Sequence, residues 1–249
     1  MKKLLRKKMF WVGTLLFVCM VTCILFNYKQ TGVFLNTKGN IPIYRVDTKE
    51  KKIAFTFDVS LGDEYLDKIL DVLDKYNIKS TFFLVGDWID KNPEKVKDIY
   101  KRGHEIGNHS NKHPDMTRIS KDKMIKDINI NDAKIRKLVG KGTKIFRCPS
   151  GSYNDDVINT AKEMGLYTIQ WDVDSIDWKE QGADLEYNRI IKKAKPGSIM
   201  LFHNTAKYTP DNLKRIIETL RKNDFVFVKV GDLIYKDNYY IDSAGVQKK

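Results

Sequence analysis

The sequence predicts an α/β domain built around a parallel sheet, and two observations lead to this prediction. Between residues 53 and 230, short apolar runs of four to six residues alternate with segments whose apolar residues recur at helical spacing. Glycine or proline lies at many of the junctions, where a strand or helix would end. No long change of composition interrupts the alternation, so we expect one domain.

The expected strands are the short apolar runs at residues 53–57, 81–85, 104–107, 144–147, 167–171, 198–202 and 225–230. The expected helices carry apolar residues three or four positions apart, at residues 66–73, 93–102, 121–139, 155–164, 184–194 and 210–223. Pro93 and Pro210 suit the first turn of a helix, while Ser120 and Gly140 suit the start and end of the long central one. Strands and helices therefore alternate along the chain, as parallel sheets require.

The N-terminal segment predicts a membrane anchor. Residues 9–26 are eighteen uncharged residues that follow five basic side chains in residues 1–8. A helix of that length spans roughly 27 Å, close to the thickness of the hydrocarbon core of a bilayer. The basic flank favours a cytoplasmic N-terminus and an exported remainder. A cleaved signal peptide is the alternative, but residues 27–32 contain no small-x-small cleavage site.

The expected organisation is therefore a cytoplasmic tail at 1–8, an anchor at 9–26, a stalk at 27–43, a folded domain at 44–236 and a C-terminal tail at 237–249. We expect a single-pass protein of the cell membrane with its domain outside the cytoplasm. The three cysteines, two of them inside the apolar run, exclude a disulfide-built scaffold.

The net charge of +13 suits polyanionic surroundings such as cell-wall polymers or anionic lipid. An alternative is that the lysines only solvate the surface. No aromatic-and-basic nucleic-acid motif is present, and the export signal argues against a nucleic-acid partner, so none is expected.

Polar residues follow most of the expected strands. Asp58, Arg147 and His203 each come at the end of a strand, while His109 with His113 and Asp177 follow two others. The carboxyl ends of parallel strands meet at one face, where βα-loops build active sites. Two histidines four residues apart can share one metal ion, although loop or cap histidines have the same spacing. Taken singly, Asp58 could be a helix cap, Arg147 a structural ion-pair partner and His203 a core residue.

Five ordered motifs resemble those of the NodB-like polysaccharide deacetylases across residues 44–236. The motifs are Thr56-Phe57-Asp58, His109-x-x-x-His113, Arg147-Cys148-Pro149-Ser150-Gly151, Asp174-Ser175-Ile176-Asp177-Trp178 and Leu201-Phe202-His203. Residues 103–110, 170–175 and 235–240 carry a closer likeness to the PdaB-type sporulation deacetylases. The resemblance implies a distorted seven-stranded (β/α) barrel. It also implies that the protein removes N-acetyl groups from the amino sugars of a cell-wall glycan. The expected glycan is peptidoglycan, and the expected setting is spore formation.

The resemblance also implies a role for each motif residue. His109 and His113 are expected to bind a divalent metal, usually zinc, while Asp58 acts as general base and Arg147 orients it. His203 is expected to be the general acid, held by Asp177. The backbone N–H of Ser150 would support the oxyanion, and Trp178 would line the substrate pocket. Taken alone, a tryptophan such as Trp178 is more often a core or rim residue than one that contacts substrate.

One departure from the family pattern concerns the metal. Family members usually carry a second, metal-binding aspartate after the first, and Val59 stands at that position here. Asp58, Asp63 or Glu64 could supply the missing ligand, or water could fill its place. A second hypothesis follows from Val59: a catalytically weakened barrel that binds cell-wall glycan or has a structural role.

Overall fold

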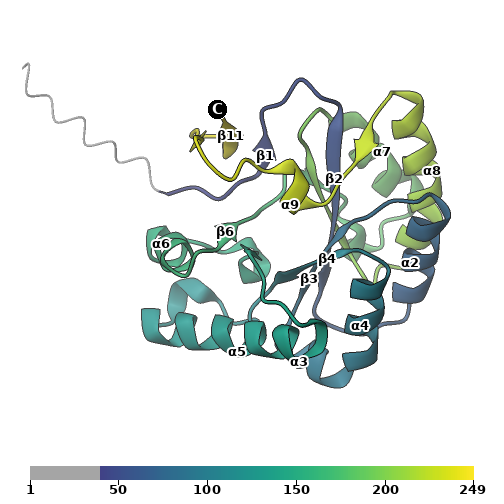
Figure 1. The fold of residues 1–249 in the computed structure, drawn as a ribbon. Coiled ribbons are helices and arrows are strands. Elements are labelled where there is room, and N and C mark those ends of the chain that lie inside the picture. The colour runs from purple at the N-terminus through teal and green to yellow at the C-terminus, as the bar shows by residue number, and fades with distance from the viewer. Residues whose placement is uncertain (1–39) are drawn as a thin grey trace, which may run out of the picture. The chain divides into compact units, whose positions relative to one another are not determined.

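The computed structural model describes residues 40–249, which are built around a curved, wholly parallel sheet (Figure 1). In this range the strand order is β6-β5-β4-β3-β2-β8-β7, with β9 beside the start of β2. The strands of this sheet are β2 (Lys52–Val59), β3 (Thr81–Leu84), β4 (Glu105–Asn108), β5 (Ile145–Phe146), β6 (Tyr167–Thr168), β7 (Val173–Asp174), β8 (Ile199–His203) and β9 (Val226–Phe227). The predicted α/β class and parallel sheet are confirmed.

The sheet is curled but not closed, which gives the expected barrel its distortion. The end strands β6 and β7 do not pair with each other. Residues 43–46 bridge the gap instead, because Ile43 pairs with Ile169 beyond β6 and Arg45 pairs with Ser198 at the start of β8. The last residues of the segment expected as a stalk are therefore packed against the domain.

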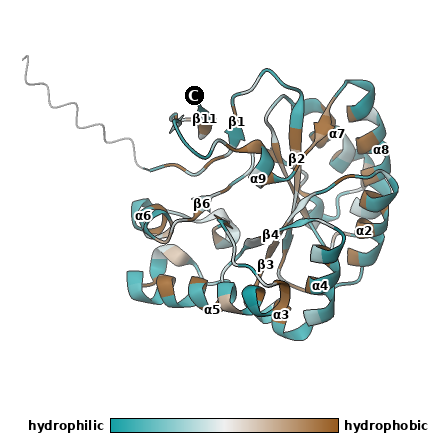
Figure 2. Ribbon diagram, in the orientation of Figure 1, coloured by the Kyte–Doolittle hydropathy of each residue, from teal (hydrophilic) through white to brown (hydrophobic). Residues whose placement is uncertain are grey.

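Helices cover the outer face of the sheet (Figure 1). They are α2 (Leu66–Lys75), α3 (Gly86–Lys91), α4 (Pro93–Lys101), α5 (Lys121–Val139), α6 (Asp155–Glu163), α7 (Ala183–Lys193) and α8 (Thr209–Lys222). The short helix α9 (Val230–Leu233) lies on the inner side instead, where Val230 and Leu233 pack with Ala54 and Phe83. Figure 2 shows brown apolar stripes along helices whose other faces are teal and polar. Helical spacing of the apolar residues produces these stripes, and burying them holds the helices on the sheet.

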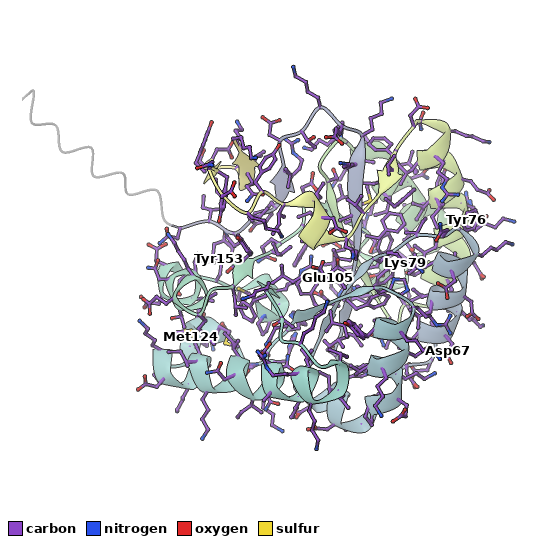
Figure 3. All side chains as sticks on the ribbon, in the orientation of Figure 1. Asp67, Tyr76, Lys79, Glu105, Met124 and Tyr153 are labelled. Carbon is purple, nitrogen blue, oxygen red and sulfur yellow. The ribbon has the colours of Figure 1, made fainter. Side chains whose placement is uncertain are left out.

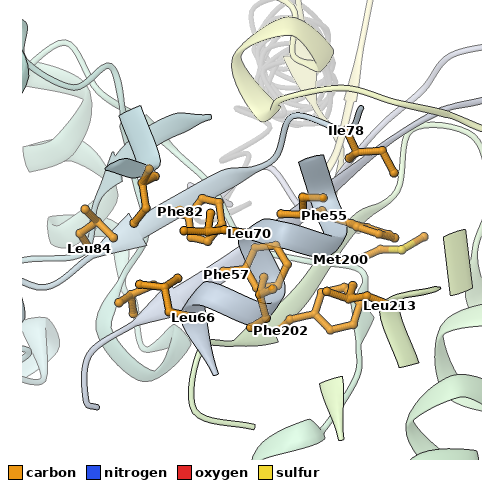
Figure 4. Packing of buried hydrophobic residues seen from close by; sticks show 14 of the residues in the cluster. Phe55, Phe57, Leu66, Leu70, Ile78, Phe82, Leu84, Met200, Phe202 and Leu213 are labelled. Atoms are coloured by element: carbon orange, nitrogen blue, oxygen red, sulfur yellow. The ribbon is translucent and has the colours of Figure 1, made fainter. Parts of the chain in front are cut away.

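Strand β2 separates the apolar core from the functional face. Its residues alternate, so Phe55, Phe57 and Val59 point to the helix-covered side, while Thr56 and Asp58 point to the other side. Phe57 stacks on Phe82 at a ring-centroid distance of 4.8 Å. Figure 4 shows this aromatic group packed with leucines of α2 and α8.

The structure differs from the sequence predictions at the ends of two expected strands. Gly86 was expected only to end a strand, but it begins α3, where Gly86 and Asp87 donate to the carbonyls of Ser110 and Asn111. The strand expected at 225–230 is short, because Val230 and Gly231 start α9 by donating to Thr81 and Glu105. Both departures depend on partners distant in the sequence, which local periodicity cannot reveal.

The segment 237–249, expected as a tail, is folded. It contains β10 (Tyr240–Ile241) and β11 (Val246–Lys248), and β11 pairs in parallel with β1 (Arg45–Val46). Figure 1 shows β1 and β11 together. Gly245 has a positive φ of 75°, and a Cβ there would lie 2.3 Å from the Tyr44 ring, so only glycine permits this approach. No helix in residues 40–249 has the length and apolar character to cross a bilayer, and the predicted anchor at 9–26 lies outside the described residues.

Candidate active site

The register of the sheet brings the expected site residues together at the carboxyl ends of the strands. Asp58 of β2 and His203 of β8 are paired residues on adjacent strands. Two strands further, the N–H of Arg147 donates to the carbonyl of Asn108, which places Arg147 beside His109. Four side chains from distant parts of the chain thus meet at one edge, as the sequence predicts.

Asp58 and Arg147 form a buried ion pair. Arg147 has no exposed surface, and its Nη1 donates to Asp58 Oδ1 at 2.8 Å and to Thr56 Oγ1 at 2.9 Å. Its remaining nitrogens reach the carbonyls of Ile169 and Gln170, and Phe83 packs against the guanidinium. Burial alone would raise the pKa of Asp58, but the charges of Arg147, His109 and His203 outweigh burial and lower it. Asp58 is therefore an ionised proton acceptor.

The two expected metal ligands lie next to each other. The His109 and His113 rings are 4.9 Å apart between centroids. His109 Nδ1 donates to the Arg147 carbonyl at 2.9 Å, which leaves Nε2 as a lone-pair donor 3.5 Å from Asp58 Oδ2. Burial lowers the pKa of both imidazoles, that of His109 to about 4, so both are neutral near pH 7. Neutral imidazole is the form that binds metals.

The loop that carries His113 is held by helix α5. Asp127 of α5 accepts from the backbone N–H groups of Asn111, at 2.7 Å, and Lys112, at 3.2 Å. Ser110 Oγ accepts from the His113 N–H at 2.9 Å. Ser110 and His113 both have positive φ values, a conformation that these contacts maintain.

The fit to a metal is partial. His109 and His113 supply two nitrogen donors, but no group of three His, Cys, Asp or Glu side chains able to hold a metal occurs in residues 40–249. Val59 is fully buried on the apolar side of β2, facing away from the imidazoles. Asp63 and Glu64 are exposed on the following loop and do not complete the set. Zinc usually has three protein ligands at a catalytic site, so this site is one short.

His203 and Asp177 form the second pair. His203 Nδ1 lies 2.7 Å from Asp177 Oδ1, and the backbone N–H of His203 donates to Asp177 Oδ2 at 2.8 Å. Thr209 and the N–H of Trp178 also donate to this carboxylate. Burial would lower the pKa of His203, but its hydrogen bond to Asp177 and the charge of Asp177 outweigh burial and raise it. His203 therefore keeps a proton to higher pH than an ordinary histidine.

The remaining predicted residues lie around this centre. Trp178 follows Asp177 directly and is 59% exposed, so its ring lies at the surface rather than in the core. Ser150 is exposed in the short 3₁₀ turn Pro149–Gly151 after β5, with a φ of 54°. Cys148 is buried, and burial raises its pKa to about 12, so it is not a nucleophile.

Sequence reasoning missed three supporting residues. Thr56 orients Arg147, Thr209 binds Asp177, and Asp127 fixes the histidine loop. Thr56 had a detectable signal, because it lies two residues before Asp58 and so faces the same side of the strand. Thr209 and Asp127 act across long separations in the chain, and no local pattern marks them.

Comparison with known proteins identifies the family. A sequence model described as polysaccharide deacetylase matches residues 45–169. The peptidoglycan-N-acetylmuramic acid deacetylase PdaA of Bacillus subtilis is 33% identical over 204 residues, covering 80% of this chain and 78% of that protein. The chain belongs to the polysaccharide deacetylase family. The family match includes Asp58, His109, His113 and Arg147, and ends before the Asp177–His203 pair.

Two further similarities differ in what they suggest about activity, because one relative is named as a deacetylase and another is described as a pseudoenzyme. A peptidoglycan-N-acetylglucosamine deacetylase of Bacillus cereus is 37% identical over 196 residues, 77% of this chain and 92% of that protein. A CE4 family pseudoenzyme from Bacillus anthracis has a similar structure, with a TM-score of 0.74 and 35% identity over 77% of this chain and 68% of that chain. A mutant of that pseudoenzyme, with a TM-score of 0.75, is described as having restored enzymatic activity; its 35% identity covers 77% of this chain and 70% of that one. This member of the family is thus similar both to relatives named as deacetylases and to one described as a pseudoenzyme.

Proposed function

We propose that this polysaccharide deacetylase hydrolyses the N-acetyl group of an amino sugar in peptidoglycan. One observation carries the proposal: a carboxylate paired with an arginine and an imidazole paired with a second carboxylate are register partners on adjacent strands. Asp58 is paired in register with His203, and the surroundings of each favour the charged form. Amide hydrolysis needs such a base and acid, because water must lose a proton and the leaving amine must gain one.

The reaction assigns each proton to a side chain. Asp58 accepts a proton from water as its oxygen bonds to the acetyl carbon, and Arg147 keeps Asp58 oriented and ionised. His203 then donates its Nε2 proton to the sugar nitrogen as the carbon–nitrogen bond breaks, which leaves acetate and a free amine. Asp177 stabilises the imidazolium before transfer. His109 and His113 would hold a divalent metal, which when bound polarises the carbonyl and its attacking water.

The substrate and location follow from relatives and from the sequence. One named relative acts on N-acetylmuramic acid and another on N-acetylglucosamine, both in peptidoglycan. We place the domain on the outer side of the membrane, held by residues 9–26, where peptidoglycan is accessible. The likeness to PdaB-type sequences supports a role during spore formation.

The test is acetate release from peptidoglycan by the full chain, with and without added Zn²⁺, beside Asp58→Asn. Release by the parent chain that is lost in Asp58→Asn supports the proposal. Loss on metal removal and recovery on zinc addition would show that two histidines suffice. If neither peptidoglycan nor chitin oligomers yield acetate under any condition, the deacetylase proposal is wrong.

A second function has its own supporting observation. Val59 is buried in the apolar core where family members place a metal ligand, and the chain resembles a pseudoenzyme. The alternative is therefore a barrel that binds cell-wall glycan without turnover. Pull-down of the chain by insoluble peptidoglycan distinguishes the two: binding that persists in Asp58→Asn and His203→Ala, without acetate release by the parent, favours the binding protein.

A further inference from the structure

A cavity lies at the opposite end of the sheet from Asp58. It has a volume of about 540 Å³ and is bordered by the start of β4 and by residues 141–144, which precede β5. Small-molecule sites have volumes of roughly 300–1,000 Å³, so this cavity is large enough for a ligand. Nothing in the proposed deacetylation uses it, because the catalytic groups follow the other ends of the strands.

Four lysines line the cavity: Lys101, Lys141, Lys144 and Lys229. In the part of the chain that the structure describes, only Lys229 among them forms an ion pair, with Asp232 at 3.4 Å. Three lysines without a carboxylate partner thus line one cavity, and their summed positive charge favours an anionic occupant.

The acidic side chain in the cavity wall is already engaged. Glu105, labelled in Figure 3, accepts from Thr81 Oγ1 at 2.8 Å and from the Gly231 N–H at 2.9 Å. Those two bonds tie Glu105 Oε2 to β3 and α9. The cavity therefore has an excess of positive charge even with Glu105 ionised.

The rest of the wall is apolar and aromatic. Ile106, Ile135 and Val139 line it together with Tyr100, whose ring lies 5.1 Å from Lys141 Nζ. An aromatic ring beside aliphatic side chains suits the C–H face of a sugar, while lysines bind phosphate as mobile point charges. The lining thus matches a ligand that has both a sugar ring and a phosphate group.

We propose that this cavity binds a phosphorylated sugar, with the phosphate monoester among Lys101, Lys141 and Lys144 and the ring against Tyr100. A doubly charged monoester is attracted by three lysines more strongly than a singly charged carboxylate is. The site is independent of the deacetylase proposal, because it lies at the other end of the strands. Its occupant would leave the catalytic face open.

His104 offers a local reporter for the cavity. It lines the wall, is 3% exposed, and its Nδ1 accepts from the Ser80 N–H at 3.1 Å, so the ring proton is on Nε2. Within residues 40–249, Nε2 has no hydrogen-bond partner. An anion bound nearby changes the chemical shifts of this imidazole without requiring direct contact.

The test is calorimetric titration of the full chain with glucose 1-phosphate, with glucose and inorganic phosphate as separate arms. We expect glucose 1-phosphate to bind more tightly than either part alone and to shift the His104 ring resonances. The triple variant Lys101→Gln, Lys141→Gln, Lys144→Gln should weaken binding by about tenfold.

The matched control removes the same charge elsewhere. Lys192→Gln, Lys193→Gln, Lys214→Gln changes three exposed lysines of α7 and α8 and should alter affinity less than about twofold, since exposed charges at a distance are screened. Asp58→Asn should bind as the parent does. Absence of binding, equal weakening in both triple variants, or inorganic phosphate binding as tightly as the sugar phosphate would each overturn the proposal.

Discussion

The two halves of the candidate active site differ in completeness. In the half formed by Asp177 and His203, the carboxylate has four donors and the imidazole has its partner. In the half formed by Asp58, Arg147 and the two histidines, the supporting contacts are equally well made, but one metal ligand is missing. The contacts that position Asp58 and the two histidines are thus formed without a third metal ligand in residues 40–249.

The difference has a physical basis in strand β2. Val59 lies on the apolar side and contributes to the same core as Phe57, so its side chain stabilises the metal-free fold. An aspartate at that position would place a carboxylate near apolar groups, a cost that only a bound metal or another partner would offset. Metal affinity and metal-free stability are thus opposed at this one residue.

The largest expected effect is on acetate release, and it tests whether the Asp58 half and the His203 half of the site both take part in the reaction. If the chain is a deacetylase, Asp58→Asn and His203→Ala should each lower the rate of acetate release by about 10²- to 10⁴-fold, because each removes one proton-transfer group. The control is Asp63→Asn, which makes the same chemical change at an exposed carboxylate. Retained activity in either variant would show that its half is not part of the reaction.

The next prediction concerns the stability of the half formed by Asp58, Arg147 and the two histidines. Arg147→Met should lower the free energy of unfolding by about 3–5 kcal/mol, because it leaves Asp58 buried without its counter-ion. Adding Asp58→Asn to this variant should restore part of the loss. Urea unfolding measures both, with the exposed Arg118→Met as control. A loss under about 1 kcal/mol would mean that water reaches Asp58.

A third prediction concerns a substitution at Val59 that adds a carboxylate as a possible third metal ligand. Val59→Asp should lower the free energy of unfolding of the metal-free chain by about 1–3 kcal/mol, through an unpaired buried polar group. It should also raise zinc affinity by at least about tenfold if the new carboxylate turns toward His109 and His113. Calorimetry of zinc binding checks this, with Val59→Asn as a polar control of equal size. Equal zinc affinity in both variants would show that this residue cannot reach the metal.

The smallest effect concerns the pKa of His203. Asp177→Asn should lower that pKa, because Asp177 supplies the main favourable hydrogen bond and charge. Since the pair raises the folded-state pKa, its stabilisation is present below the unfolded pKa and is lost as pH rises through the folded value. The variant should therefore lose the acid form of His203 at lower pH. NMR titration of the imidazole measures the shift, and Asp174→Asn should give a smaller one.

Much of the site was predictable because strand ends are visible in the sequence. Asp58, Arg147 and His203 each follow an apolar run, and parallel strands bring such residues to one edge. The pairing of Asp58 with His203 was not predictable, because register depends on contacts between strands 145 positions apart. The full burial of Val59 could not be predicted without knowing which face of β2 the helices cover. Helix α9 could not be predicted because it depends on the distant residues Thr81 and Glu105.

The pairing of β1 with β11 has a consequence for how the protein is made. Arg45 is paired with Val246, so β1 gains its strand partner only when a segment about 200 residues later in the chain is present. A ribosome or a translocation channel that still holds residues 246–248 keeps this small sheet open. Contacts of such wide separation form late, because closing a long loop costs entropy before any contact is gained. We conclude that this small sheet forms only after residues 246–248 have been synthesised and are free to pair with β1.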